Sequence, residues 1–228
     1  MSINFLKSLL LSATLISFSY ANSNDLDLKN DGLSISIDEE TIVIKRVFDN
    51  ECKKINGADP KNIWTGNYAN PRLPEACVKK FVTTVGAITP MKINDKIETI
   101  GEIEVINFID DSQENKNMLL IDARLPDWFL QMTIPTAENI PFTYFDKDKY
   151  PDDFYDVLDS IGAEELSKNK YDFKNAKELV LFCNGPWCPQ STFAIKNLIK
   201  IGYPQEKIKW YRGGMYSWKM LNLTTVSE

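Results

Sequence analysis

The sequence predicts an α/β fold with a mainly parallel sheet that helices cover on both faces. Three short apolar runs, at 118–121, 179–182 and 208–211, are typical of buried strands. Helical patterns separate these runs, because apolar residues recur at helix spacing in 154–161 and 194–201. Strands that alternate with helices along a chain usually pair in parallel and are buried on both faces.

Each helical pattern has its own end signals. Pro151 and Asp152 indicate a helix start before the first pattern, and Gly162 follows its last apolar residue. Ser191 is the expected N-cap of the second helix, and Gly202 is expected to end it in a left-handed conformation. We therefore expect one helix between the first two predicted strands and a second helix before the third.

The region before the sheet has a different character. Residues 33–37 alternate with period two and residues 41–44 are mostly β-branched, so we expect two strands there. The following stretch, 49–77, is rich in proline, glycine and polar residues, and Cys52 and Cys77 bracket it. A loop this long needs tethering, so we expect a structural Cys52–Cys77 disulfide. A metal site is disfavoured because no second ligand stands at Cys-x-x-Cys spacing.

Residues 1–21 have the pattern of a secretory signal peptide. Lys7 supplies the positive charge, a short apolar run follows, and Ser19 and Ala21 are small residues at the cleavage positions. The run is short for a membrane span and polar residues interrupt it. We expect cleavage after Ala21, a periplasmic or secreted protein, and no stable membrane insertion afterwards. Disulfides persist in such an oxidising space.

Composition excludes several classes of function. The 228 residues are 43% hydrophobic and 25% charged, which is typical of a globular protein. Histidine is absent, which excludes Ser-His-Asp triads, Cys-His nucleophile pairs and His-ligated zinc or haem within this chain. The net charge of −6 makes a nucleic acid a poor partner. We expect no metal and no cofactor.

Cys183 is the strongest candidate for chemistry. It directly follows the predicted strand at 179–182, and a helix starts shortly after it. A thiol at this point meets backbone N–H groups and the positive end of a helix dipole, so we expect its pKa to be lowered. A buried, inert cysteine is the alternative. The loop that would bind a substrate comprises Asn184, Gly185, Trp187, Cys188, Gln190 and Ser191.

Four segments resemble the rhodanese-like domain family of sulfurtransferases, and they occur in the family's order. They are Leu-Ile-Asp-Ala-Arg at 120–124, Ile-Pro-Thr-Ala-Glu-Asn-Ile-Pro at 134–141, the strand and loop from 180 to Ser191, and Arg-Gly-Gly-Met at 212–215 with Trp218. The resemblance implies a rhodanese-like domain over 100–228. Residues 22–99 are then a small, irregular, β-containing N-terminal region to which we assign no function.

The resemblance implies covalent catalysis of sulfur transfer. The Cys183 thiolate would take sulfane sulfur from a donor, thiosulfate or a persulfide, and pass it to a thiophilic acceptor. The implied partners are a small sulfur donor and a thiol acceptor, or a reducing or sulfur-carrier protein. Asp122 and Arg124 would support the loop, although a plain buried ion pair explains them equally. Trp187 would line the pocket or pack on the surface.

The active-site loop departs from the family pattern Cys-x-x-Gly-x-Arg-Ser. Ser191 follows Cys183 by eight positions instead of six, and Gln190 replaces the arginine. The loss of this positive charge weakens the case for thiosulfate as the donor. Phosphatases of the same fold need a loop arginine to clamp phosphate, so we do not expect phosphatase chemistry.

Cys188 is a second cysteine within the same loop, and it leaves three roles open. It could resolve a Cys183 persulfide by forming a disulfide, or it could be a passive loop residue. It could also make the domain a thiol–disulfide oxidoreductase that uses Cys183 and Cys188. A further alternative for the whole domain is a non-catalytic module that binds sulfur species or a partner protein.

Overall fold

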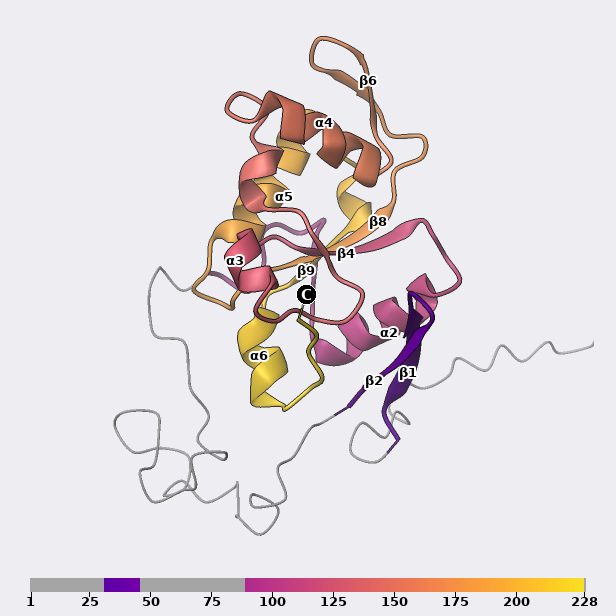
Figure 1. Ribbon diagram of the computed structural model, residues 1–228. Helices are drawn as coiled ribbons and strands as arrows, with labels where there is room; N and C mark the ends of the chain where they lie inside the picture. Colours follow the sequence, from indigo (N-terminus) through magenta and orange to yellow (C-terminus); the bar gives the residue numbers. More distant parts are fainter. Residues whose placement is uncertain (1–30, 46–88, 228) are drawn as a thin grey trace, which may run out of the picture.

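A five-stranded parallel sheet forms the centre of the protein in the computed structural model, which describes residues 31–45 and 89–227 (Figure 1). The strand order is β3-β9-β8-β4-β5, and every neighbouring pair is parallel. The strands are β3 (Glu98–Ile100), β4 (Met118–Asp122), β5 (Glu138–Asn139), β8 (Glu178–Phe182) and β9 (Ile208–Tyr211). The prediction of an α/β fold with a mainly parallel sheet is confirmed.

The two central strands, β4 and β8, are buried on both faces. Alternate side chains enter two separate apolar cores, because successive residues of a strand point to opposite faces. Leu179 and Leu181 of β8 lie in one core, whereas Val180 and Phe182 lie in the other. This explains why these strands are continuous apolar runs instead of alternating ones.

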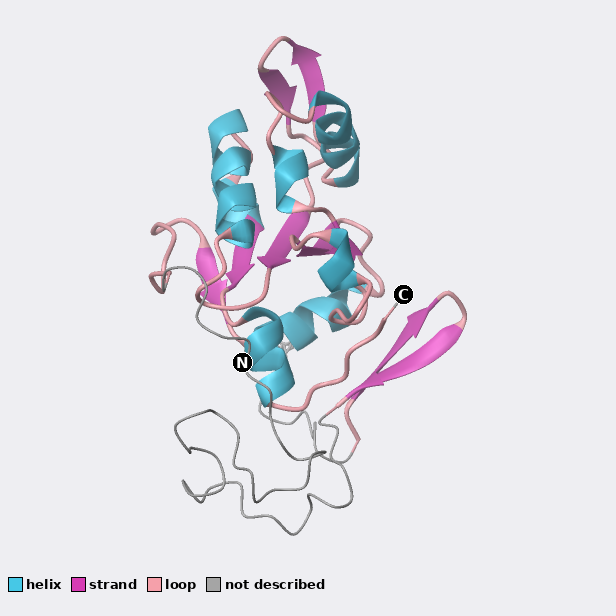
Figure 2. Ribbon diagram, turned by 60° about the vertical axis from the view of Figure 1, so that its left-hand side comes forward, coloured by secondary structure: helices cyan, strands magenta, loops and turns pink. Residues whose placement is uncertain are grey.

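Helices cover each face of the sheet (Figure 2). On one face lie η4 (Phe142–Phe145), α4 (Pro151–Ser160) and α5 (Gln190–Ile201), and on the other lie α2 (Glu102–Ser112) and α6 (Gly214–Met220). Two shorter elements lie in connecting segments: α3 (Pro126–Phe129) between β4 and β5, and η5 (Gln205–Lys207) between α5 and β9. The two predicted helices are confirmed as α4 and α5, whereas the sequence analysis did not identify α2.

The predicted C-terminal end of α5 is confirmed, whereas its predicted N-cap is wrong. Gly202 ends the helix in the left-handed conformation, with φ of 89°. The N-cap, however, is Pro189 and not Ser191. Ser191 lies within the first turn, where its hydroxyl is turned toward the sulfur of Cys183 instead of capping the helix.

Two antiparallel hairpins lie outside the main sheet. The first consists of β1 (Leu33–Ile37) and β2 (Glu40–Ile44), which confirms both strands predicted there. Figure 1 shows it beside α2, and its Ile35 and Ile44 are buried in the core that contains α2 and α6. The second hairpin, β6 (Glu164–Ser167) and β7 (Lys170–Asp172), extends beyond α4.

The C-terminal segment connects the first hairpin to the domain. The Thr224 hydroxyl accepts a hydrogen bond from Lys45 N at 3.0 Å and donates one to Val43 O at 2.8 Å. The Thr224 carbonyl accepts a hydrogen bond from Trp218 Nε1 of α6 at 2.6 Å. Residues far apart in the sequence are thereby joined along one side of the molecule.

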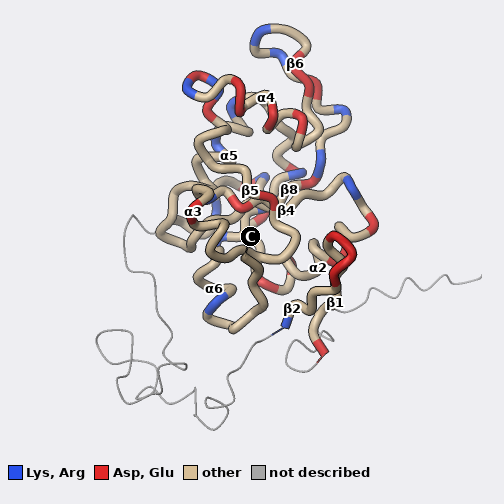
Figure 3. Tube along the Cα trace, in the orientation of Figure 1, with Lys and Arg blue, Asp and Glu red and all other residues tan. Residues whose placement is uncertain are grey.

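Charged residues lie mainly on the outer elements, with acidic clusters on α2, α4 and β6 (Figure 3). Within the described ranges, Asp122 and Arg124 are the only charged side chains that are buried. No helix in the described part of the chain is both long enough and apolar enough to cross a bilayer. The predicted signal peptide at 1–21 and the predicted Cys52–Cys77 disulfide lie outside the described residues.

We predict that the β1–β2 hairpin is an integral part of the domain. Replacing the buried Ile44 with alanine should lower the free energy of unfolding by about 2–4 kcal/mol, because it leaves a cavity against α2. Urea unfolding of the full chain measures this change. Thr41→Ala, on the exposed side of the same hairpin, is the matched control and should change stability little. Equal stabilities of the two variants would show that the hairpin does not contribute to the core.

Candidate active site

Cys183 is the first residue after β8, at the carboxyl end of the parallel sheet. Its carbonyl accepts a hydrogen bond from Met215 N at 3.0 Å, and the next carbonyl, of Asn184, accepts one from Tyr216 N at 2.9 Å. The first turn of α6 therefore holds the chain where it leaves the strand. Ligand sites of parallel α/β sheets lie at this edge.

Gly214 makes this contact possible. It has a φ of +54°, and a Cβ built on it would lie 2.1 Å from the carbonyl oxygen of Cys183. Any side chain there would push α6 away from the loop, and the backbone conformation also favours glycine. The glycine pair at 213–214 therefore has a direct role in positioning Cys183.

The Cys183 sulfur is almost completely buried, with 3% of the residue exposed. Ser191 Oγ donates a hydrogen bond to it at 3.2 Å, and Trp210 Nε1 donates to Ser191 Oγ at 3.1 Å. Because the indole N–H can only donate, it directs the serine hydroxyl hydrogen toward the sulfur. Strand β9 and helix α5 thus jointly provide one hydrogen-bond donor to Cys183.

Cys188 lies directly against Cys183. A tight turn, closed by the hydrogen bond from Cys188 N to Gly185 O at 2.9 Å, brings the loop back over β8. Cys183 Sγ donates to the carbonyl of Cys188 at 3.3 Å, and the side chains of the two cysteines are close enough that each shifts the pKa of the other. Both are free thiols, and Cys188 is 5% exposed. The predicted proximity of the two sulfurs is therefore present.

The ionisation of the pair differs from the sequence prediction. Burial raises the pKa of Cys183 well above its usual range, and its hydrogen bond to Cys188 raises it further. The pKa of Cys188 is instead lowered to about 6, first by the hydrogen bond from Cys183 and then by the N–H groups of Gln190 and Asn184. The positive charge of Arg124 contributes as well. The expectation of a lowered Cys183 pKa was wrong, because burial has the largest effect on Cys183 and the N–H groups of Gln190 and Asn184 act on Cys188 instead.

Two thiols this close titrate as a unit, since ionisation of one opposes ionisation of the other. The first proton leaves near pH 6, from Cys188, whereas the pKa of Cys183 is raised. At neutral pH the negative charge of the pair is therefore carried by Cys188, and Cys183 remains a thiol.

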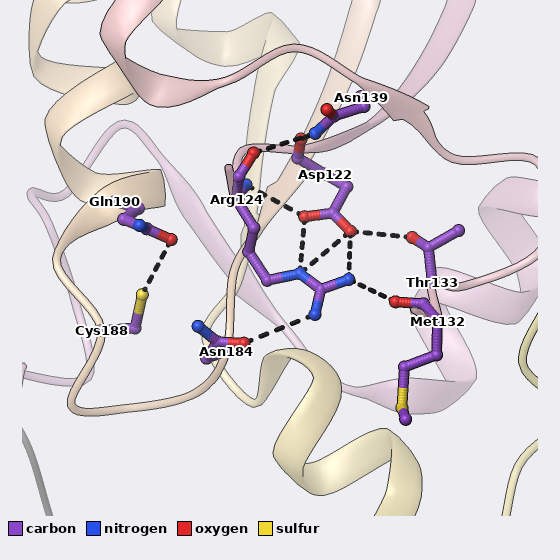
Figure 4. A network of polar contacts seen from close by, with 8 residues as sticks. All are labelled: Asp122, Arg124, Met132, Thr133, Asn139, Asn184, Cys188 and Gln190. Atoms are coloured by element: carbon purple, nitrogen blue, oxygen red, sulfur yellow. Dashed lines mark hydrogen bonds and ion pairs between the residues drawn. The ribbon is translucent and has the colours of Figure 1, made fainter. Parts of the chain in front are cut away.

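The buried ion pair of Asp122 and Arg124 lies beside this loop (Figure 4). Arg124 Nη2 is 2.6 Å from Asp122 Oδ2, and Arg124 Nε is 2.9 Å from Asp122 Oδ1. Thr133 Oγ1 donates to the same carboxylate at 2.8 Å. Asp122 and Arg124 are 0% and 1% exposed, so the pair depends on these hydrogen bonds to offset its lost hydration.

The ion pair joins four segments of the chain. Arg124 also donates to the carbonyl of Met132 at 2.5 Å and to Asn184 Oδ1 at 3.4 Å. Asn139 Nδ2 donates to the carbonyls of Asp122 and Arg124 at 3.0 and 2.9 Å. A single buried network therefore connects the end of β4, the 132–133 segment, β5 and the loop that follows Cys183.

Other contacts hold the far side of the loop. The ring of Trp187 packs edge-to-face with Tyr216, with centroids 4.9 Å apart. The carbonyl of Pro186 accepts hydrogen bonds from the N–H and hydroxyl of Thr89, at 2.7 and 2.6 Å. Arg212 in turn donates to the Thr89 carbonyl. The segment just before β3 is thereby attached to the candidate active site.

Gln190 and Cys188, the two residues that depart most from the family's loop, contact each other. Cys188 Sγ lies 3.5 Å from Gln190 Oε1, at hydrogen-bonding distance for sulfur (Figure 4). Of the predicted loop residues, Ser191 and Cys188 contact Cys183 and Gln190 contacts Cys188. Asn184 contacts Arg124 of the buried ion pair, whereas Trp187 packs on Tyr216. Within the described ranges, no group of three or more potential ligands is placed to hold a metal ion.

Sequence reasoning missed several residues that build the site. Thr133, Asn139, Trp210, Tyr216 and Thr89 all contact the loop, its serine or the ion pair. Trp210 carries a signal that could have been used, because a tryptophan inside a buried strand needs an acceptor for its N–H. Thr89 carries none, since it lies far from the loop in sequence and in no recognisable pattern.

The family model of the rhodanese-like domain matches residues 107–221. The chain belongs to the rhodanese-like domain family. This match covers the loop, the buried ion pair and the Gly-Gly motif, but it begins after β3 and the β1–β2 hairpin. The matched range includes Cys183, which remains the candidate nucleophile.

Solved structures with related folds have low sequence identity. The BH2092 protein from Bacillus halodurans is 21% identical, with a TM-score of 0.40, and the match covers 57% of this chain and 77% of that one. Thiosulfate sulfurtransferase from Pseudomonas aeruginosa is 16% identical, with a TM-score of 0.37, covering 57% and 20%. A rhodanese from E. coli is 19% identical, with a TM-score of 0.31, covering 49% and 99%. A search of curated protein sequences found no match.

We predict that the thiol pair loses its first proton near pH 6. The ultraviolet absorbance of thiolate should rise with a midpoint near pH 6, because the pKa of Cys188 is lowered to about that value. Cys183→Ala removes the hydrogen bond that contributes most, so the midpoint should move upward. Cys188→Ser should lose this step altogether. A wild-type midpoint at about 8.5, the ordinary value for cysteine, would contradict the lowered pKa of Cys188.

We also predict that the buried ion pair is needed for folding stability. Arg124→Leu should lower the free energy of unfolding by roughly 3–5 kcal/mol, because it leaves the Asp122 carboxylate buried without its cation. Chemical denaturation measures the change. The double variant Asp122→Leu/Arg124→Leu should recover part of the loss, since no unpaired charge remains. A double variant less stable than Arg124→Leu would refute this explanation.

Proposed function

We propose that the protein is a sulfurtransferase that carries sulfane sulfur on Cys183. The observation that supports it most is the environment of the Cys183 sulfur. This thiol stands at the carboxyl end of β8, accepts a hydrogen bond from Ser191, and donates its own proton toward the neighbouring Cys188. Membership in the rhodanese-like family supports the same assignment.

The first half-reaction loads the sulfur. Cys188, as the thiolate of the pair, takes the proton of Cys183 across their hydrogen bond. The Cys183 thiolate then attacks the outer sulfur of a persulfide donor, the donor's S–S bond breaks, and its thiolate leaves. Cys183 becomes a persulfide. No histidine is needed for this step, because the second thiol of the loop acts as the base.

The second half-reaction unloads the sulfur. An acceptor thiolate attacks the outer sulfur of the Cys183 persulfide, and the Cys183 thiolate leaves. The Ser191 hydroxyl, already 3.2 Å from the sulfur, stabilises the negative charge that returns to Cys183. The cycle therefore needs a small sulfane-sulfur donor and a thiol acceptor, and no cofactor.

The charge around the loop favours an alkyl persulfide over thiosulfate as donor. Arg124 is engaged by the Asp122 carboxylate, and Gln190 stands where the family's arginine would clamp an anion. The pair of thiols itself carries a negative charge, which repels a dianion. Because the two cysteines are only 3% and 5% exposed, the donor must also displace part of the loop to reach their sulfurs.

We further propose that this chemistry takes place outside the cytoplasm. Lys7, the apolar run after it and the small residues before position 22 support export through cleavage of residues 1–21. In an oxidising space, a reducing partner would be required to keep Cys183 and Cys188 as thiols.

The test is to locate the transferred sulfur. The reduced full chain is treated with glutathione persulfide or with thiosulfate, and the peptide that contains Cys183 is analysed by mass spectrometry. The Cys188→Ser variant lacks the base and loads more slowly, so we expect one added sulfur atom on its Cys183 after prolonged incubation, with more loading from glutathione persulfide than from thiosulfate. The Cys183→Ser variant is the matched control and should acquire none at position 183. Absence of added sulfur with both donors would refute the proposed function.

A further inference from the structure

Cys188 occupies a position from which it can react with a sulfur-loaded Cys183. We propose that Cys188 attacks the Cys183 persulfide, releases hydrosulfide, and leaves a Cys183–Cys188 disulfide that a dithiol partner must reduce. The inference rests on the proposed function, because it starts from the Cys183 persulfide. It makes the domain a sulfane-sulfur reductase with two catalytic thiols.

The contact between the thiols is the first step of the argument. Both are free, both are buried, and they are hydrogen-bonded to each other within one loop. The turn from Gly185 to Cys188 and the hydrogen bond from Cys183 Sγ to the Cys188 carbonyl keep them together. A sulfur added to Cys183 therefore arrives beside a nucleophile that is already in place.

The reaction balances without an external oxidant. The Cys188 thiol, which took the Cys183 proton during loading, passes that proton to the outer sulfur as its own sulfur forms a bond to the Cys183 sulfur. The bond from the Cys183 sulfur to the outer sulfur breaks. The outer sulfur leaves with the electron pair as hydrosulfide. The sulfane sulfur is thus reduced to the level of sulfide, and the two cysteines are oxidised to a disulfide.

The choice between the two sulfurs of the persulfide follows from their leaving groups. Attack on the outer sulfur would expel the Cys183 thiolate, whereas attack on the inner sulfur expels hydrosulfide. Burial makes Cys183 the weaker acid of the two leaving groups, and a weaker acid gives a slower leaving group. The Cys183 sulfur, which becomes the inner sulfur, also already lies 3.3 Å from the carbonyl of Cys188. Both considerations favour the disulfide over a relay of sulfur to Cys188.

The environment of Cys188 is suited to a second nucleophile. The N–H groups of Gln190 and Asn184 lower the pKa of its sulfur, and Gln190 Oε1 accepts a hydrogen bond from the Cys188 thiol at 3.5 Å. Gln190 stands where the family's loop has an arginine that would clamp an anionic donor. In this chain the residue at that position contacts the second thiol instead.

The partner that completes the cycle is a dithiol reductant. Its two thiols exchange with the Cys183–Cys188 disulfide, so the partner becomes a disulfide and the domain regains both thiols. Two electrons and two protons pass from the partner in each cycle. A single thiol of low molecular weight would instead leave a mixed disulfide within the buried loop.

The experiment compares wild type with Cys188→Ser in a single turnover. The reduced full chain, freed of reductant, is mixed with one equivalent of glutathione persulfide, then acid-quenched for sulfide assay and peptide masses. Wild type should release one hydrosulfide per chain and lose two hydrogens in a linkage of Cys183 to Cys188. Cys188→Ser lacks the base for loading, so it is quenched only after the donor is consumed; it should then keep the added sulfur on Cys183 and release at least about tenfold less sulfide. Cys188→Ala and circular dichroism test whether the substitution alters the fold.

Each other outcome overturns a defined part of the account. A wild-type chain that keeps a stable Cys183 persulfide, without a disulfide, would refute this inference and leave the proposed function intact. Added sulfur on Cys188 of wild type would refute it in favour of a relay. A disulfide in wild type, combined with no sulfur on Cys183 in folded Cys188→Ser, would refute both the inference and the proposed function.

Discussion

The buried ion pair of Asp122 and Arg124 is the constraint on which the candidate active site depends. Two charges that are almost completely removed from water are tolerated only where hydrogen bonds satisfy them, and here the partners come from separate parts of the chain. Thr133 and Met132 hold it on one side, and Asn184 on the other. The loop after Cys183 is thereby connected to the centre of the sheet, which fixes it for chemistry.

The second organising feature is the division of roles between two adjacent thiols. Cys183 has the geometry of the nucleophile, with Ser191 as a donor to its sulfur, but burial disfavours its charge. Cys188 holds the charge, because it accepts from Cys183 and from the loop's N–H groups. In the proposed reaction, Cys188 is the base and Cys183 is the residue that is loaded, so a chain without histidine still has a base at its active site.

Much of the fold could be predicted from the sequence, because apolar periodicity reports burial directly. The strands β4, β8 and β9 and the helices α4 and α5 carry strong patterns of this kind. The cysteines and the ion pair of the candidate site could be named from the sequence, but several residues that hold the loop, and the electrostatics of the thiols, could not. Which sulfur the loop's N–H groups face is decided by the tertiary path of the loop, and the sequence does not show it. The contact of Thr89 with Pro186 also depends on three-dimensional proximity alone.

The central claim is that sulfur is loaded on Cys183, inside the loop that the ion pair supports. A crystal structure of Cys188→Ser after treatment with glutathione persulfide tests this claim most directly. The account predicts electron density for one additional atom bonded to Cys183 Sγ, with the Asp122–Arg124 pair and its contact to Asn184 retained. Density for the added sulfur on another cysteine, with Cys183 unmodified, would contradict it.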